Sequence, residues 1–269
     1  MITILLQERG DDLKKIYFIF SFVLISVLCL NSTYAASISW YCKRNNLHNQ
    51  PILDGNLSFC EGYDVFWCDK KHKSMDAEKV IYLTFDAGYE NGNVEKIVDI
   101  LNEENVKGAF FVLDNILINN QNLIKKMIDS GHTIANHTYK HKDMTKLTSK
   151  EEFGCELKKL EDLYYELYGE QMPKYYRPPE GKLNENNLKW AQELGYKTVM
   201  WSFAYADWDN QKQPSKEYAL KKIYENIHNG EVMLLHPTSK TNSEIIKEVI
   251  VELKKQGFRF GTLDELCQN

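Results

Sequence analysis

The stretch KVIYLTFDAGYE, residues 79–90, joins a short apolar run to a polar, glycine-containing end. The run Val80–Phe85 has the length and the β-branched and aromatic content of a buried strand. The apolar residues that follow recur at intervals of three and four, as on one buried face of a helix: Val94, Ile97, Val98 and Leu101. A strand followed by a helix is the repeating unit of a parallel sheet.

The same alternation of apolar runs and amphipathic segments continues to the C-terminus. It predicts seven strands: Val80–Phe85, Ala109–Val112, His132–Asn136, Tyr175–Arg177, Lys197–Trp201, Glu231–Leu235 and Phe258–Phe260. Glycines stand between the predicted helices and the next strands, where a left-handed cap is favoured: Gly131, Gly195, Gly230 and Gly257. We therefore expect an α/β fold, a distorted parallel (β/α) barrel of about seven strands. Periodicity alone leaves open whether the sheet closes.

The chain before this region has a different character. A basic pair, Lys14 and Lys15, precedes an apolar run over residues 16–30. Small residues follow at Ala35 and Ala36, as at a signal-peptide cleavage site. This order is typical of a secretory signal peptide, because about 15 apolar residues are fewer than the roughly 20 that span a bilayer. An uncleaved signal anchor is the alternative, and it would tether the protein to the membrane. We expect an extracytoplasmic protein with three parts: a signal segment at 1–36, a short irregular extension at 37–75 and a catalytic domain at 76–269.

The composition argues against nucleic acid as a partner, and it does not determine whether or how the cysteines pair. The formal net charge of −5 argues against nucleic-acid binding, since such proteins concentrate Lys and Arg. Export would permit a disulfide among Cys42, Cys60 and Cys68, but the pairing cannot be read from the sequence. Cys155 lies in an apolar helical pattern, and we expect it to be a small buried residue. The chain has no CxxC pair, so we expect no cysteine zinc site.

Polar residues stand where several predicted strands end, and in a barrel these ends meet on one face. Asp86 directly follows Val80–Phe85; its alternative role is that of an ordinary turn residue. His137 and His141 are four residues apart after another strand, a spacing that suits one divalent cation. Their alternative is a pair of solvated surface histidines.

Three further polar residues complete this set. Arg177 is followed by two prolines, which stiffen its loop and suit it to orient a buried carboxylate. His236 ends the strand Glu231–Leu235, and Asp207 offers a carboxylate to tune it. Taken singly, Arg177 is equally consistent with packing at a proline turn, and His236 with a core histidine.

In this order, the motifs resemble those of the polysaccharide deacetylase family, or NodB-homology domain, over roughly residues 75–266. The family's Thr-Phe-Asp-Asp-Gly, His-(Ser/Thr)-x-x-His, Arg-x-Pro-x-Gly, Asp-Trp and Leu-x-His motifs have counterparts here. The resemblance implies a metal-dependent N-deacetylase with a distorted barrel. It also implies individual roles: Asp86 as general base, Arg177 as its partner, His137 and His141 as metal ligands, Asp207 as the residue that tunes His236, His236 as general acid, and the main-chain N–H of Glu180 as an oxyanion donor.

One position departs from the family pattern. Ala87 stands where the family usually has a metal-binding aspartate, and a methyl group cannot bind a metal. We expect zinc, with cobalt or manganese as alternatives, and either a lower affinity or a changed ion preference. A glycan-binding protein that has lost catalysis is therefore an alternative function.

A narrower resemblance is to the delta-lactam-biosynthetic de-N-acetylases of spore-forming bacteria. It is carried by residues 84–92, by the Arg-Pro-Pro-Glu-Gly loop at 177–181, by 201–208 and by Leu-Leu-His at 234–236. In that subgroup the second aspartate is commonly replaced. The resemblance implies that the substrate is N-acetylmuramic acid in peptidoglycan glycan strands, before the muramic lactam of spore cortex forms. A chitin- or xylan-type deacetylase would share the same catalytic residues and stays an alternative.

Aromatic residues close to these motifs are candidates for sugar stacking. Tyr89, Tyr205 and Trp208 neighbour site residues in the sequence, and their faces suit sugar rings. Trp201 lies inside a predicted strand, and we expect it to be a core aromatic.

Overall fold

The computed structural model describes residues 36–44, 47–73 and 76–268. Apart from Ala36, the predicted signal segment lies outside the described residues and stays a prediction. Within those ranges, no helix combines the length and the apolar character that crossing a membrane requires.

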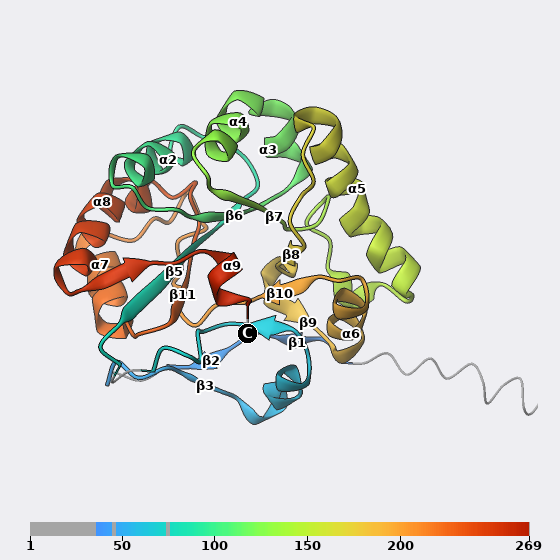
Figure 1. Cartoon of the computed structure of the whole chain (residues 1–269), viewed down its shortest axis with the longest axis horizontal. Coiled ribbons are helices and arrows are strands. Elements are labelled where there is room, and N and C mark those ends of the chain that lie inside the picture. Colours follow the sequence, from blue (N-terminus) through green and yellow to red (C-terminus); the bar gives the residue numbers. More distant parts are fainter. Residues whose placement is uncertain (1–35, 45–46, 74–75, 269) are drawn as a thin grey trace, which may run out of the picture. The chain divides into compact units, whose positions relative to one another are not determined.

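A parallel sheet forms the centre of the described chain (Figure 1). Its strands follow the order β11-β5-β6-β7-β8-β10-β4, and β12 pairs with the start of β5. All these pairings are parallel. The bounds are β4 (Val65–Phe66), β5 (Lys79–Ala87), β6 (Ala109–Val112), β7 (Thr133–Asn136), β8 (Tyr175–Tyr176), β10 (Lys197–Val199), β11 (Glu231–Leu235) and β12 (Phe258–Phe260). The predicted distorted parallel barrel is confirmed, and β4 adds a strand from the N-terminal extension.

Isolated bridges join the two ends of this sheet. Phe203, beyond the end of β10, bridges Met233 of β11, and the N–H of Leu234 donates to the carbonyl of Phe203 at 2.9 Å. Cys68, beyond the end of β4, bridges Glu231 at the start of β11. The barrel therefore closes through single bridges and not through a continuous ladder of strand pairing.

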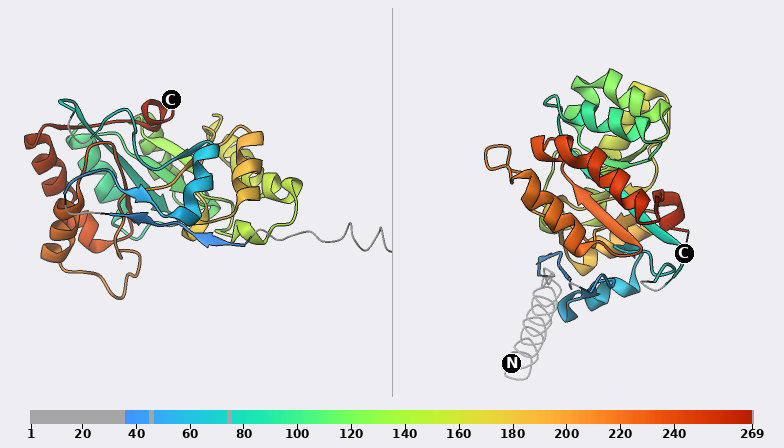
Figure 2. Two further views of the ribbon diagram at one scale, coloured as in Figure 1. Left: turned by 90° about the horizontal axis from the view of Figure 1, so that it is seen from below. Right: turned by 90° about the vertical axis from the view of Figure 1, so that its left-hand side faces the viewer.

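Most of the helices lie around the outside of the sheet (Figures 1 and 2). They are α2 (Val94–Glu103), α3 (Asp114–Asn119), α4 (Gln121–Asp129), α5 (Lys150–Tyr168), α6 (Glu185–Glu193), α7 (Lys216–Asn226), α8 (Lys240–Lys255) and α9 (Leu263–Leu266). The predicted stripe on α2 is buried as expected: Val94, Ile97, Val98 and Leu101. Burial of each such side chain contributes roughly 1.5–3 kcal/mol, which holds the helix against the sheet.

The N-terminal extension packs against the barrel. β1 (Ile38–Ser39) pairs antiparallel with β9 (Lys182–Leu183), β2 (Cys42–Lys43) pairs with β3 (Ile52–Leu53), and a 3-10 segment, η1 (Gly55–Gly62), follows. The indole N–H of Trp40 donates to the carbonyl of Trp201 at 2.8 Å, and the N–H of Trp40 donates to the carbonyl of Gly181 at 2.9 Å. The extension thus supports the loops that follow β8 and β10.

The cysteines correct one prediction. Cys155 is exposed, because the buried stripe of α5 runs through Phe153, Glu156 and Leu157 and leaves position 155 on the outer side of the helix. The other described cysteines are buried: Cys42, Cys60, Cys68 and Cys267. All five described cysteines are free thiols.

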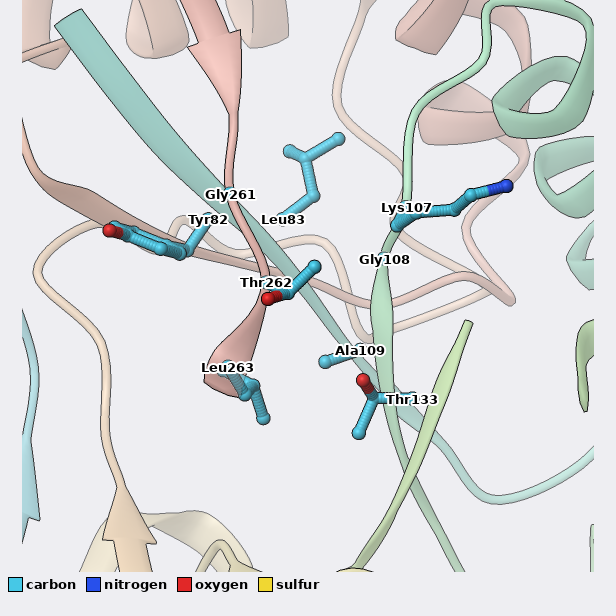
Figure 3. Close-up of a pocket in the computed structure, with 9 residues that line it drawn as sticks. All are labelled: Tyr82, Leu83, Lys107, Gly108, Ala109, Thr133, Gly261, Thr262 and Leu263. Carbon is cyan, nitrogen blue, oxygen red and sulfur yellow. The ribbon is translucent and has the colours of Figure 1, made fainter. Parts of the chain in front are cut away.

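A crevice lies towards the amino-terminal ends of the strands, between the starts of β6 and β7 and the segment after β12 (Figure 3). It is too narrow to admit a water molecule. The side chain of Lys107 points away from Thr262 and Leu263 on the other wall. The predicted site residues lie at the opposite end of the strands, where the wider cavity is.

Candidate active site

The carboxyl ends of the strands surround a cavity of about 600 Å³. This volume is in the range of pockets that hold small ligands. The residues that line it come from separate sequence motifs: Asp86, His141, Glu180, Trp201, Ala204, Tyr205, Trp208, Leu234 and His236. The barrel thus brings together most of the residues that were predicted singly.

Asp86 lies near the end of β5 and is held by an arginine. The guanidinium Nη1 of Arg177 donates to Oδ1 of Asp86 at 2.9 Å, and Oδ2 lies 3.5 Å from Nε2 of His137. Burial by itself would raise the pKa of this carboxyl group. The charge and hydrogen bond of Arg177, together with the charge of His236, outweigh burial, so the pKa is lowered and Asp86 is ionised.

Arg177 is fully buried and all its contacts fix its orientation. Its Nε donates to the carbonyl of Val199 at 2.9 Å, and Nη2 donates to Thr84 Oγ1 at 2.8 Å and to the carbonyl of Met200 at 3.2 Å. The guanidinium carbon lies 4.1 Å from the ring centroid of Phe111. These contacts hold the guanidinium in one orientation, from which Nη1 reaches the Asp86 carboxylate.

The loop after Arg177 turns sharply into the cavity wall. Pro178 and Pro179 stiffen it, and Glu180 and Gly181 have φ angles of 56° and 63°. A Cβ atom at Gly181 would lie 2.6 Å from the indole ring of Trp201, so only glycine fits there without displacement. The side chain of Glu180 pairs with Lys182 at 2.7 Å.

His137 and His141 lie in one tight turn after β7. Their ring centroids are 5.0 Å apart. Nδ1 of His137 lies 2.9 Å from the carbonyl of Arg177, so Nδ1 carries the proton and donates it, leaving a lone pair on Nε2. Burial lowers the pKa of His137 to about 4, so the ring is neutral.

The surroundings of His137 fit a cation. Nε2 of His137 and Oδ2 of Asp86 are both acceptors, yet they face each other across 3.5 Å. A main-chain carbonyl on the far ring nitrogen is the arrangement usual for metal-binding histidines. Ala87 is buried and offers no donor, and no group of three His, Cys, Asp or Glu placed to hold a metal occurs in the described ranges. Among the described residues, the candidate protein ligands are therefore the two imidazoles of His137 and His141, with the Asp86 carboxylate beside His137.

His236 follows β11 and is bound to Asp207 at two points. Oδ1 of Asp207 lies 2.7 Å from Nδ1 of His236, and Oδ2 accepts the main-chain N–H of His236 at 2.8 Å. Burial lowers the pKa of His236, but the hydrogen bond and charge of Asp207 raise it more, so it lies above its ordinary value. Nε2 is therefore the ring nitrogen left for other chemistry.

Sequence reasoning missed Asn242, on the first turn of α8. Its Nδ2 donates to Oδ2 of Asp207 at 2.7 Å and to the carbonyl of His236 at 3.1 Å, and its Oδ1 accepts from the hydroxyl of Tyr205. A polar residue on the buried side of an amphipathic helix was the available signal.

The aromatic candidates occupy different places. Trp208 is 61% exposed at the cavity rim, with its ring centroid 6.1 Å from that of His236. Tyr205 is buried in the wall, whereas Tyr89 is 43% exposed, is hydrogen-bonded to Asn210, and does not line the cavity. Trp201 corrects one part of a prediction, because β10 ends at Val199 and Trp201 lies on the loop beyond it. Its partly buried ring packs against a core cluster, as expected of a core aromatic, and also lines the cavity.

Known proteins match this chain in sequence and in structure. The family model described as polysaccharide deacetylase matches residues 73–199. The peptidoglycan-N-acetylmuramic acid deacetylase PdaA of Bacillus subtilis (strain 168) is 40% identical over 230 residues, covering 85% of this chain and 85% of that protein. A peptidoglycan-N-acetylglucosamine deacetylase of Bacillus cereus is 34% identical over 192 residues, covering 70% of this chain and 68% of that protein. The solved structure of B. subtilis PdaA, described as a family 4 carbohydrate esterase, matches with a TM-score of 0.79 and 39% identity, covering 86% of this chain and 96% of that chain.

Proposed function

Because the chain belongs to the polysaccharide deacetylase family, we propose that it hydrolyses the N-acetyl group of N-acetylmuramic acid in peptidoglycan glycan strands. The similarity to PdaA over most of both chains supports this substrate. One observation carries the mechanism: Asp86 and His236 line the same cavity, and each is held by a buried partner, Arg177 for the carboxylate and Asp207 for the imidazole.

Asp86 is the general base in this mechanism. Its lowered pKa keeps it ionised at neutral pH, so it can accept the proton of the attacking water. Arg177 orients the carboxylate through Oδ1 and leaves Oδ2 directed towards His137. Since Arg177 is fully buried, it acts through Asp86 and does not touch the substrate.

His236 is the general acid. Hydrolysis of an amide expels an amine, which leaves readily only when it is protonated. Nδ1 of His236 is bound to Asp207, so Nε2 is the atom that gives up the proton. Although burial lowers the pKa of His236, the hydrogen bond and charge of Asp207 raise it above its ordinary value, which favours retention of this proton.

The main-chain N–H of Glu180 is the proposed donor to the oxyanion. Glu180 lines the cavity in a strained turn between Pro179 and Gly181. A donor on a stiff loop needs no reorganisation when charge develops on the substrate oxygen.

His137 and His141 are the proposed ligands of a divalent cation, with zinc favoured over cobalt and manganese. Such an ion supplies a Lewis acid that polarises the amide carbonyl and makes water more acidic. The hydrogen bond at Nδ1 of His137 keeps Nε2 unprotonated and ready to bind. With Ala87 in place of a carboxylate, we expect weaker binding than at a site with three protein ligands.

The proposed setting is the cell wall of a spore-forming bacterium. Removal of the acetyl group would expose the amine from which the muramic delta-lactam of spore cortex forms. The predicted signal segment at 1–36 would deliver the extension at 37–75 and the catalytic domain at 76–269 to the outside of the cytoplasmic membrane, released or tethered.

A second candidate is a glycan-binding protein without catalysis. The observation that favours it is Ala87, which removes one expected metal ligand. The retention of both acid–base residues with their partners favours the enzyme.

A measurement of acetate release by the purified protein distinguishes a deacetylase from a glycan-binding protein without catalysis. The substrates are peptidoglycan glycan strands without stem peptides, and chitooligosaccharides, each with added zinc, cobalt, manganese or no metal. We expect metal-dependent release from the muramic-acid-containing strands alone. Release from chitooligosaccharides would point to the broader polysaccharide specificity, and no release from either, together with measurable binding of the strands, would establish the glycan-binding alternative.

A further inference from the structure

The turn that carries the two histidines has a strained backbone. Thr138 and His141 have φ angles of 72° and 54°, in the left-handed region that residues other than glycine rarely adopt. Such conformations persist only where the surrounding structure fixes them. The groups that fix this turn therefore also fix the position of the His141 ring.

Asn136 anchors the first half of the turn. It is fully buried at the end of β7, its Oδ1 accepts the N–H of Thr138 at 2.9 Å, and its Nδ2 donates to the carbonyl of Leu157 on α5 at 3.0 Å. The first strained residue is thus tied to helix α5.

Glu156, also on α5, anchors the second half of the turn. Its Oε1 accepts the main-chain N–H of Lys140 at 3.1 Å, and its Oε2 pairs with Nζ of Lys142 at 2.9 Å. These two partners are the residues on either side of His141. The ammonium group of Lys140 is held in turn by the buried carboxylate of Asp114 on α3.

The position of Glu156 is unusual for a carboxylate. Its side chain is only 4% exposed, in the buried stripe of α5 next to Leu157 and Leu160. A charged group in such a stripe is destabilising unless hydrogen bonds and an opposite charge offset its lost hydration. Both carboxylate oxygens of Glu156 interact with the turn that carries the histidines, and an apolar side chain could not make these interactions.

We propose that Glu156 is a positioning residue that holds His141 in its strained conformation and thereby sets the affinity of the His137–His141 pair for a divalent cation. The inference rests on the proposed function, because it requires this pair to be the cation site. Glu156 is not among the residues that line the cavity, and its bonds to the turn are made to Lys140 and Lys142.

The test measures Zn²⁺ binding to the full-length protein directly, by calorimetry or by competition with a chromophoric chelator. Glu156→Gln keeps the size of the side chain and loses the ion pair. We expect its Kd for Zn²⁺ to rise about 10-fold or more, as for other groups that orient metal ligands. The visible absorption of the Co²⁺-loaded variant should also shift, since it reports ligand geometry. Glu151→Gln, an exposed change on the first turn of the same helix, is the matched control and should leave both signals unchanged.

If Glu156→Gln does not fold, a second variant tests the same proposal. Lys142→Met leaves the buried carboxylate and removes its exposed partner, and we expect a smaller but measurable loss of Zn²⁺ affinity. Unchanged Zn²⁺ affinity in the folded variants, with tight binding by the wild type, would overturn the role of Glu156 and leave the proposed function intact. If the wild type binds no Zn²⁺ yet releases acetate, the metal site itself is wrong and the inference fails with it.

Discussion

Asp207 holds both the ring and the main chain of His236: its Oδ1 lies 2.7 Å from Nδ1, and its Oδ2 accepts the main-chain N–H at 2.8 Å. Asn242 adds a donor to Oδ2 at 2.7 Å. The carboxylate is buried and fixed in one orientation, and its two contacts with His236 fix the orientation of the imidazole. This pair fixes which nitrogen of His236 faces the cavity and how readily it is protonated.

The Asp207–His236 pair predicts a pH profile. A general acid works only while protonated, and Asp207 raises the pKa of His236 above its ordinary value. Activity should therefore persist above that ordinary pKa and fall as pH rises through the raised one. Asp207→Asn removes the charge that raises the pKa, so the alkaline limb of kcat should move to lower pH. The check is kcat against pH for both proteins, and an unmoved limb would refute the assignment.

Removing either residue that we propose to transfer protons should stop turnover without unfolding the protein. Asp86→Asn and His236→Ala should each lower kcat at least about 100-fold, which is the contribution of a positioned acid or base. Arg177 stays buried in Asp86→Asn and keeps its bonds to Val199, Met200 and Thr84. Circular dichroism and thermal unfolding are the controls, and near-normal activity in either folded variant would contradict the mechanism.

The sequence predicted which residues would meet at the candidate site, because those residues follow the ends of strands. Asp86, Arg177 and His236 each come after a strand with a visible apolar run. Parallel strands place their carboxyl ends on one face, so residues distant in the chain could be predicted to meet. The extent of each strand was harder to predict, since β10 stops at Val199 and the tryptophan at 201 becomes part of the cavity wall.

Other features left no periodic signal. The barrel closes through single bridges between distant segments, such as Cys68 with Glu231, and one bridge produces no sequence pattern. Asn242 and Glu156 act from the buried sides of helices, where a polar residue is visible but its partner is not. Exposure of Cys155 follows from the angular position of the buried stripe on α5, which apolar content alone did not locate.

Gly181 should tolerate no side chain. It has a φ angle of 63°, and a Cβ atom would lie 2.6 Å from the ring of Trp201 and 3.0 Å from Cβ of Trp40. Gly181→Ala should destabilise the fold by about 1–3 kcal/mol through overpacking and backbone strain. It should also lower kcat/KM, because Trp201 and the Glu180 turn line the cavity. Thermal unfolding and kinetics test both effects, and Gly169→Ala, a left-handed helix cap with no atom near its Cβ, separates backbone strain from the clash.

Trp208 should contribute to substrate binding and little to folding. It is 61% exposed at the rim of the cavity, close to the ring of His236, so its loss removes few internal contacts. Trp208→Ala should change the free energy of unfolding by less than about 0.5 kcal/mol. If the sugar ring stacks on Trp208 about as strongly as a second aromatic ring would, the contact contributes roughly 0.5–1.5 kcal/mol, so KM for glycan strands should rise up to about 10-fold while kcat changes less. Tyr165→Ala is the matched control, an aromatic residue on α5 that is 54% exposed and outside the cavity lining, and it should alter neither constant. Equal KM values for the Trp208 variant and the wild type would show that the sugar does not stack on this ring.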